Sequence, residues 1–207
     1  MNIPLTNERA LRSDAVANRE RVLAAAAVAF KRDGERVPMA TIAEEAGVGI
    51  GTLYRRYPTR AALLAALSQR SWDLVLDHAR TAADAEGPAL DAIARFLAAT
   101  IAARDDLILP LHGGPLSLDA RTLALRAEIR ELLEQVLARG RRDGSVRADA
   151  TATDIIITGA MLAQPLAHVA DWDGLARRQA EIYLAGLAAT SSSSRPRRRT
   201  SRAARSS

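Results

Sequence analysis

The chain has 207 residues, of which 48% are hydrophobic, so it can form one large or two small domains, and disorder throughout is excluded. Only 3% of the residues are aromatic and no run alternates as a strand does, so the composition favours an all-α fold. Cysteine is absent, which excludes disulfides and thiolate metal sites and fits a cytoplasmic location. We expect neither a metal site nor a cofactor.

Charge divides the chain into three parts. Residues 1–70 carry 11 basic and 7 acidic side chains, residues 71–190 carry 12 and 17, and residues 191–207 carry six arginines and no acid. A basic first part before an acidic body indicates a polyanionic partner for the first part only. The segment 191–207 is rich in Ser and Arg and has no large apolar side chain, so it is predicted to be a disordered tail.

The basic first part contains two predicted helices. Residues 1–13 are polar and are predicted to form a flexible arm. The first helix is expected over residues 14–33, where apolar side chains recur at helical spacing and Gly34 provides a stop. A short helix is expected over residues 38–46, with proline in its first turn and Gly47 at its end. The second helix covers the apolar face of the first.

The next helix, predicted over residues 50–57, has a composition that packing alone does not explain. Leu53 and Tyr57 lie on one of its faces, while Tyr54 and Arg55 point away from it. Such a short helix must be held by its neighbours, so its cationic and aromatic face is free for a partner. Two short helices joined by a glycine-containing turn form a helix-turn-helix. An exposed amphipathic helix with solvated charges is the alternative.

Four short motifs run through this part of the chain. They are Ile-Ala at 42–43, Ala-Gly-Val at 46–48, Gly-Thr-Leu-Tyr at 51–54 and Tyr-Pro-Thr-Arg at 57–60. In their order and spacing they closely resemble the DNA-binding domain of the tetracycline-repressor (TetR) family, and the resemblance covers about residues 18–67. It implies that the helix of residues 50–57 enters the major groove of DNA.

The resemblance also implies which residues contact DNA. Those commonly meeting phosphates or base edges are Thr52, Tyr54, Arg56 and Arg60, and those placed where bases can be read are Ile50, Gly51 and Arg55. Gly51 has no side chain, so direct readout is expected from Arg55 and Thr52. Arg55 is the better candidate because a guanidinium can bond a guanine edge twice.

Beyond the DNA-binding part, residues 14–67, the sequence predicts a second helical domain over residues 68–190. A helix from Thr59 to about Ala85 is expected to join the two parts as a lever. Further helices are expected over residues 89–103, 153–169 and 173–189, and one or two helices over residues 118–142. With three helices in the first domain and about six in the second, we expect about nine helices in all.

The last two predicted helices indicate a dimer interface. An apolar seam repeats at intervals of four and three residues, and glycine within it would allow close approach of another helix. The seam consists of Ile155, Gly159, Leu162 and Leu166, matched by Ile182, Gly186 and Leu187 in the final helix. Two such helices from each subunit would form a four-helix interface, which is the usual dimer form of the family that the chain resembles.

Polar and aromatic residues mark a candidate effector cavity. Pro165 is expected to bend its helix beside Gln164 and His168, and the irregular loop 107–115 contains His112. The resemblance implies a ligand cavity near this bend. The candidate lining residues are Trp72, His112, Gln164, His168 and Trp172. Ordinary core polar groups with internal partners are the alternative, and the effector is a small molecule of unknown identity.

The resemblance implies a ligand-responsive repressor that binds a palindromic operator in double-stranded DNA as a homodimer. A helical enzyme and an adaptor without specific DNA binding are the alternatives. We do not expect an enzyme, because the sequence pairs no nucleophile with a base. The stretch His112-Gly113-Gly114 is similar to the oxyanion loop of some esterases, but the chain has no Gly-x-Ser-x-Gly motif to supply the nucleophile. The longest uncharged run, 16 residues over 155–170, is too short and too polar to span a membrane, so no membrane partner is expected.

Overall fold

The computed structural model of the chain describes residues 5–34, 36–108, 119–166 and 168–189, with side-chain surroundings from residue 16 onward. All regular elements in these ranges are helical, which confirms the predicted all-α fold, and they comprise eight α-helices and one 3₁₀ helix. His112 and the predicted tail at 191–207 lie outside the described residues. None of the described helices is long and apolar enough to cross a membrane.

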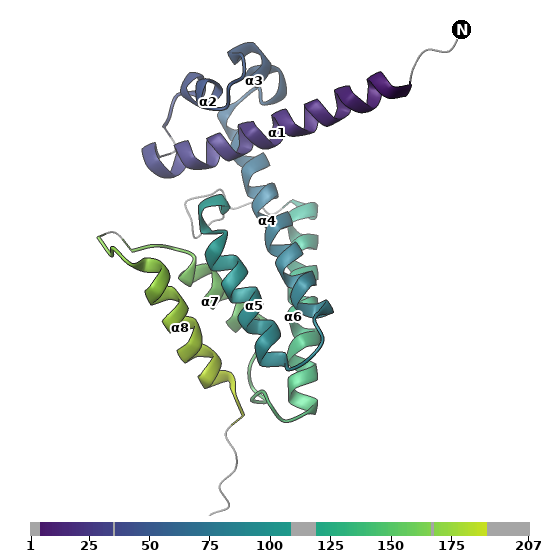
Figure 1. The fold of residues 1–207 in the computed structure, drawn as a ribbon, viewed down its shortest axis with the longest axis vertical. Helices are drawn as coiled ribbons and strands as arrows, with labels where there is room; N and C mark the ends of the chain where they lie inside the picture. The colour runs from purple at the N-terminus through teal and green to yellow at the C-terminus, as the bar shows by residue number, and fades with distance from the viewer. Residues whose placement is uncertain (1–4, 35, 109–118, 167, 190–207) are drawn as a thin grey trace, which may run out of the picture.

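The first four helices form a head and the start of a lever (Figure 1). Their bounds are α1 Leu5–Asp33, α2 Met39–Glu45, α3 Ile50–Arg56 and α4 Arg60–Asp84. Helix α1 runs across the base of α2 and α3, and its N-terminal half extends past them (Figure 1). A first core joins Leu23 and Phe30 of α1 to Ile42, Leu53 and Leu63. The head is therefore held together by one apolar stripe from each of its helices.

The remaining helices form a body around α4 and α5 (Figure 1). Their bounds are α5 Ala89–Ala102, the 3₁₀ helix η1 Arg104–Asp106, α6 Ala120–Arg142, α7 Ala152–Leu162 and α8 Trp172–Leu187. Helix α5 contacts α4, α6, α7 and α8, so it is central to the body. Its side chains Ile93, Phe96, Leu97 and Ile101 are buried in a second core. The two cores divide along α4, between Leu67 and Val75.

Helix α1 begins at Leu5, whereas the sequence predicted a flexible arm to residue 13 and a helix from Asp14. No glycine or proline interrupts residues 5–33, and the residue types there are mostly compatible with a helix. Large apolar side chains are sparse before Val22, so the amphipathic pattern gave no signal for these first turns. The helix propensity of these residue types is enough to account for the first turns.

Helix α7 ends at Leu162, whereas a helix bent at Pro165 and continuing to Val169 was predicted. Proline disfavours a helical conformation in the residue before it, so the helix stops rather than bends. The indole of Trp172, the first residue of α8, donates to the Leu162 carbonyl at 2.9 Å. This bond satisfies one of the carbonyls that the helix end leaves free. The early end of α7 therefore has a partner in α8.

Candidate DNA-binding site

The turn between α2 and α3 depends on glycine. Gly47 has a φ of +64°, a left-handed conformation that glycine adopts without strain. The Gly47 amide donates to the Glu44 carbonyl and the Val48 amide donates to the Ala43 carbonyl, both at 3.0 Å. These bonds close the C-terminal end of α2. Gly49 follows as the N-cap of α3, so the turn fixes the direction in which α3 leaves α2.

Buried side chains hold α3 on the head. Leu53 is fully buried, and Tyr57, the C-cap residue of α3, is only 6% exposed. The Tyr57 amide donates to the Leu53 carbonyl at 2.8 Å, which closes the last turn. Both side chains belong to the first core. A seven-residue helix that is unstable by itself is thereby stabilised by tertiary packing.

The rest of α3 is open to solvent. Its exposed residues are Ile50, Gly51, Thr52, Tyr54, Arg55 and Arg56. Arg55 donates to Thr52 Oγ1 at 3.3 Å, so the two residues predicted to read bases lie together. A Cβ on Gly51 would meet no atom within 4 Å, so packing does not require a glycine there. Six of the seven predicted DNA-contacting residues thus lie exposed on one helix, and their contacts with DNA stay predictions.

Arg60, the seventh predicted residue, lies in a different setting. It is the first residue of α4 and is partly buried, and its guanidinium donates to the Val37 carbonyl in the loop before α2. Thr59 caps the same helix, because its side chain accepts a hydrogen bond from the Ala62 amide at 3.1 Å. Arg60 therefore connects the start of α4 to the head, and a contact with DNA stays a prediction.

Comparison with known proteins places this site in a family. The sequence model described as bacterial regulatory proteins, tetR family, matches residues 22–67, which include α2, α3 and the C-terminal part of α1. A TetR transcription regulatory protein from Mycobacterium vanbaalenii, of known structure, is 33% identical, with a TM-score of 0.63 over 86% of this chain and 99% of that chain. The chain belongs to the TetR family.

One curated relative and one further solved structure are also similar to this chain. An HTH-type transcriptional regulator of Staphylococcus aureus (strain USA300) is 38% identical over 69 residues, which are 33% of this chain and 37% of that protein. The chain thus matches little more than a third of that curated relative's length. The structure of FadR from Bacillus subtilis, solved with stearoyl-CoA, is 16% identical with a TM-score of 0.63 over 82% of this chain and 99% of that chain, which shows a shared fold. The family and non-enzymatic class predicted from the sequence are confirmed.

In this TetR-family chain the predicted effector-pocket residues lie in several environments. Trp72 on α4 is half-buried, with the Arg126 guanidinium 5.7 Å from its ring centre. Trp172 is half-buried between α7 and α8, whereas Gln164 and His168 are exposed after the end of α7. His168 has a φ of +69°, as expected in a turn. The pocket stays a prediction, and no group of described His, Asp or Glu side chains could hold a metal ion.

The predicted dimer residues divide between the body's own core and its surface. Ile155 and Leu187 are buried in the second core, and a Cβ on Gly159 would lie 3.4 Å from Leu97 Cδ2 of α5. Leu162 is half-buried against the same core. The residues that face solvent are Leu166, Ile182 and Gly186, together with Ile157 and Met161, which the sequence analysis missed. Because apolar residues lie on every side of α7, their spacing could not indicate which side faces outward.

The segment from η1 to Ile108 joins the two cores. The Ile108 amide donates to Oγ of Ser71, a buried residue of α4, at 2.9 Å. That Oγ lies 2.9 Å from the Leu67 carbonyl and 3.2 Å from the Asp106 carbonyl, to either of which it can donate. Leu107 belongs to the second core and Ile108 to the first. Leu107 therefore packs in the body, and the next residue, Ile108, packs in the head.

Arg70 adds ion pairs between the same elements. Its Nε lies 3.1 Å from Glu20 Oε2 on α1, and its Nη1 lies 2.9 Å from Asp106 Oδ1 in η1. Lys31 on α1 also donates to the Arg104 carbonyl. These partners are between 36 and 73 positions apart, so the sequence pattern gave no signal for them. They connect α1, α4 and η1 at the boundary between head and body.

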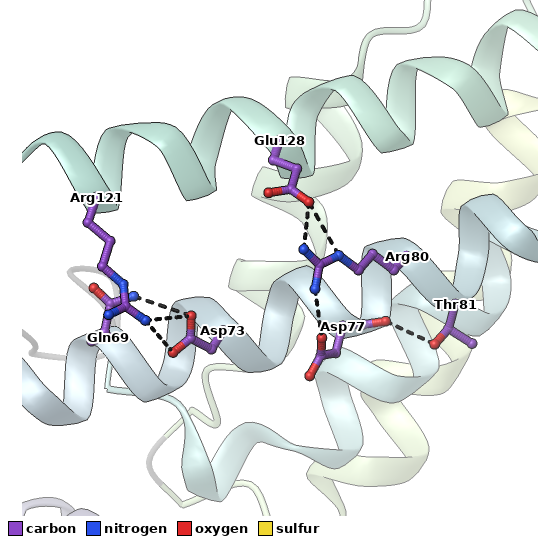
Figure 2. A network of polar contacts seen from close by, with 7 residues as sticks. All are labelled: Gln69, Asp73, Asp77, Arg80, Thr81, Arg121 and Glu128. Atoms are coloured by element: carbon purple, nitrogen blue, oxygen red, sulfur yellow. Dashed lines mark hydrogen bonds and ion pairs between the residues drawn. The ribbon is translucent and has the colours of Figure 1, made fainter.

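A polar ladder joins α4 to α6 further down the body (Figure 2). Arg121 Nη2 lies 3.3 Å from Asp73 Oδ2, and Arg80 Nη2 lies 2.7 Å from Glu128 Oε1. Both pairs join residues 48 positions apart, and the pairs are about two helical turns from each other. The two helices consequently run parallel in one register. Because the pairs are exposed, each adds only about 0–1 kcal/mol to stability.

Proposed function

We propose that the chain is a sequence-specific transcriptional regulator that binds a palindromic operator as a homodimer and responds to a small molecule. The observation that carries this proposal is the exposed cationic and aromatic face of α3, held in place by Leu53 and Tyr57. Membership of the TetR family supports the general class of regulator. Operator form, dimerisation, effector response and a cytoplasmic location are parts of the proposal.

In the proposed complex α3 enters the major groove of DNA. Arg55 and Thr52 contact base edges beside Ile50 and Gly51, because these residues are exposed and Arg55 already lies against Thr52. The residues that contact the DNA phosphates beside this groove are Tyr54, Arg56 and Arg60. These contacts fix the register of the protein on the duplex. This division of roles predicts that only the first group selects sequence.

The proposed dimer uses the outward apolar face of α7 and α8. Met161 is 62% exposed and Ile182 is 56% exposed, and Ile157 lies one turn before Met161. A Cβ on Gly186 would meet no atom of the other elements that the structure describes within 4 Å, so the surface there is open to a second copy. A two-fold axis would cover the same face on both chains and place two α3 helices about 34–36 Å apart. This face replaces the buried residues Ile155, Gly159 and Leu187 in the predicted interface.

The proposed effector response passes from the body to the head through α4. Helix α4 contributes to both cores, and Ser71 and Arg70 bind η1. The B. subtilis FadR structure, which shares this fold, was solved with stearoyl-CoA, which supports a small molecule in the helical body. A ligand that shifts α4 would change the separation of the two α3 helices, a coupling typically worth about 1–3 kcal/mol. We propose repression as the outcome of operator binding, because a bound dimer excludes other proteins from that DNA.

Selection of bound duplexes from a random DNA pool tests this function directly. We expect an enriched palindrome whose half-sites are about one helical turn apart, or 10–10.5 base pairs centre to centre. A chain with Arg55→Ala and Tyr54→Ala serves as the matched negative sample. If the full chain enriches no palindrome, it is an adaptor without specific DNA binding and the proposal is wrong.

A further inference from the structure

A hollow of about 360 Å³ lies between α1 and α3, on the side of α3 that carries Thr52 and Arg55. The residues of its wall that matter here are Asn18, Arg19, Thr52, Arg55, Arg56 and Tyr57. Helix α1 thus forms one wall and the predicted recognition helix forms the other. The seven DNA-contacting residues predicted from the sequence lie on α3 and at the start of α4.

The charges around this hollow are unbalanced. Three arginines line it and no carboxylate does. Arg19 and Arg56 form no ion pair with any described residue, and Arg55 has only the Thr52 hydroxyl. Nearby arginines are neutralised differently, since Arg32 pairs with carboxylates and Arg70 pairs with Glu20. Like charges that converge on one hollow repel each other, so an anion there would be stabilising.

Tyr57, which lines the same hollow, carries a buried hydroxyl group. The Tyr57 hydroxyl is buried and has no hydrogen-bond partner among the described residues. Burial of a hydroxyl without a partner is unfavourable, and native structures rarely leave one unsatisfied. A phosphate oxygen in the hollow would accept this O–H and would face the arginines at the same time. The two observations are independent: the arginines favour an anion, and the hydroxyl group lacks a hydrogen-bond acceptor.

We infer that this hollow binds a phosphodiester of the DNA backbone, with Arg19 supplying charge and Tyr57 donating a hydrogen bond. The inference rests on the proposed DNA-binding function and adds α1 to it. A DNA phosphate is the occupant that fits because Thr52 and Arg55, on the wall of the hollow, belong to the α3 face that meets the groove. A phosphate contact carries no base information, so it fixes the position of the protein on DNA without choosing the sequence.

Two substitutions test the site on the full chain, with the palindrome from the random-pool selection and a scrambled duplex as probes. Arg19→Gln is expected to weaken binding to both duplexes by about tenfold, because it removes one charged contact. The slope of log affinity against log salt concentration should become shallower by about one phosphate contact per subunit, or about two per bound dimer. Tyr57→Phe keeps the ring and the charge, so binding should weaken by several-fold with an unchanged slope. Neither variant should change the ratio between the two affinities.

Arg95→Gln is the matched control. It removes the same charge from an exposed position on α5, in the body, and Arg95 does not line the hollow. We expect less than a twofold loss of affinity for either duplex. Fluorescence anisotropy over a range of salt concentrations gives all these values, and circular dichroism melting confirms that each variant is folded.

The outcomes separate this inference from the proposed function. If the wild-type chain binds a palindrome but Arg19→Gln and Tyr57→Phe bind as it does, with the same salt slope, the phosphate site is wrong and the function stands. A variant that loses affinity only for the palindrome reads a base, which also overturns the site. Titration with inorganic phosphate against chloride at equal ionic strength tests a free anion. Inorganic phosphate could weaken DNA binding by the wild type but not by Arg19→Gln, while neither variant lowers DNA affinity in chloride. In that case the occupant is a free ion and the inference is overturned.

Discussion

Arg55 points to solvent because Leu53 and Tyr57, on the other side of α3, are buried in the first core. Its direction therefore depends on packing, while its proposed role depends on its five N–H donors. The motifs from Ile42 to Arg60 were enough to indicate these positions from the sequence. The proposed contribution of Arg19 was not predictable, because an arginine on a helix is usually a solvated charge, and only the fold brings it beside α3.

Replacement of Arg55 tests the proposed base contact. We expect Arg55→Ala to lower affinity for the selected palindrome by about 1–3 kcal/mol per half-site and to relax the preference at one base pair. Competition binding with single-base variants of the palindrome measures this preference. Arg95→Ala, at an exposed position on α5, is the control and should leave both affinity and preference unchanged. An unchanged preference in Arg55→Ala would assign base reading to another residue.

His78 on α4 should make stability depend on pH. Burial lowers the pKa of His78 below its usual value, with partial opposition from Asp77, and its Nδ1 is buried without a partner among the described residues. The unfolded chain then binds more protons than the folded chain, so stability is lost as pH falls below the unfolded pKa of about 6.5. Chemical unfolding between about pH 5 and pH 7 should show a steeper loss in the wild type than in His78→Gln. Parallel curves for the two proteins would rule out this role.

At the scale of elements, α4 is the helix on which both cores depend. Its predicted ends were close to the observed ones, because Thr59 is a cap and Gly87-Pro88 prevents continuation. The predicted start of α1 and the predicted end of α7 were wrong, for opposite reasons. Residues 5–15 form a helix that the apolar pattern does not mark, and residues 163–169 carry an apolar pattern that Pro165 prevents from forming a helix. The sequence therefore predicted a helix end correctly where a capping or helix-breaking residue coincides with the end of the apolar pattern.

Two buried serines on α4 give a matched test of the contact with η1. Ser71→Ala would leave the buried Ile108 amide without its acceptor, so we expect a loss of about 1–3 kcal/mol in the free energy of unfolding. Ser68 is 2% exposed, and its hydroxyl has no partner among the described residues, so Ser68→Ala should be neutral or stabilising. Denaturant unfolding of both variants measures the difference. Equal losses would mean that hydroxyl volume, and not the Ile108 bond, stabilises this region.

At the scale of the whole molecule, α7 and α8 belong to the body (Figure 1), and they carry the exposed apolar residues Ile157, Met161 and Ile182. The sequence indicated that these two helices meet a partner. It could not indicate which side faces outward, because Ile155, Ile156 and Ile157 are consecutive and only their packing on α5 separates them. The side that the core leaves uncovered is the side proposed for a second copy.

A charge on that face should separate the proposed dimer. We expect Ile182→Glu together with Met161→Glu to give a monomer by sedimentation velocity and to weaken binding to the full palindrome far more than binding to a single half-site. Both effects follow because a buried unpaired carboxylate is costly and because two linked heads bind more tightly than one. Leu123→Glu, at an exposed leucine on α6, is the control and should remain a dimer. A dimer that persists in the double variant would show that another surface holds the copies together.

The adjacent residues Leu107 and Ile108, one in each core, also limit how this protein can be taken apart. A fragment that ends after α3 or within α4 would lack Ile108, and so would lose a fully buried side chain worth about 1.5–3 kcal/mol to the head. A chimera that joins this head to the body of another regulator would have the same gap unless it also carried the η1 segment and its Ser71 partner. The unit that can be transplanted is therefore discontinuous in sequence, and grafting experiments should move residues 104–108 with the head.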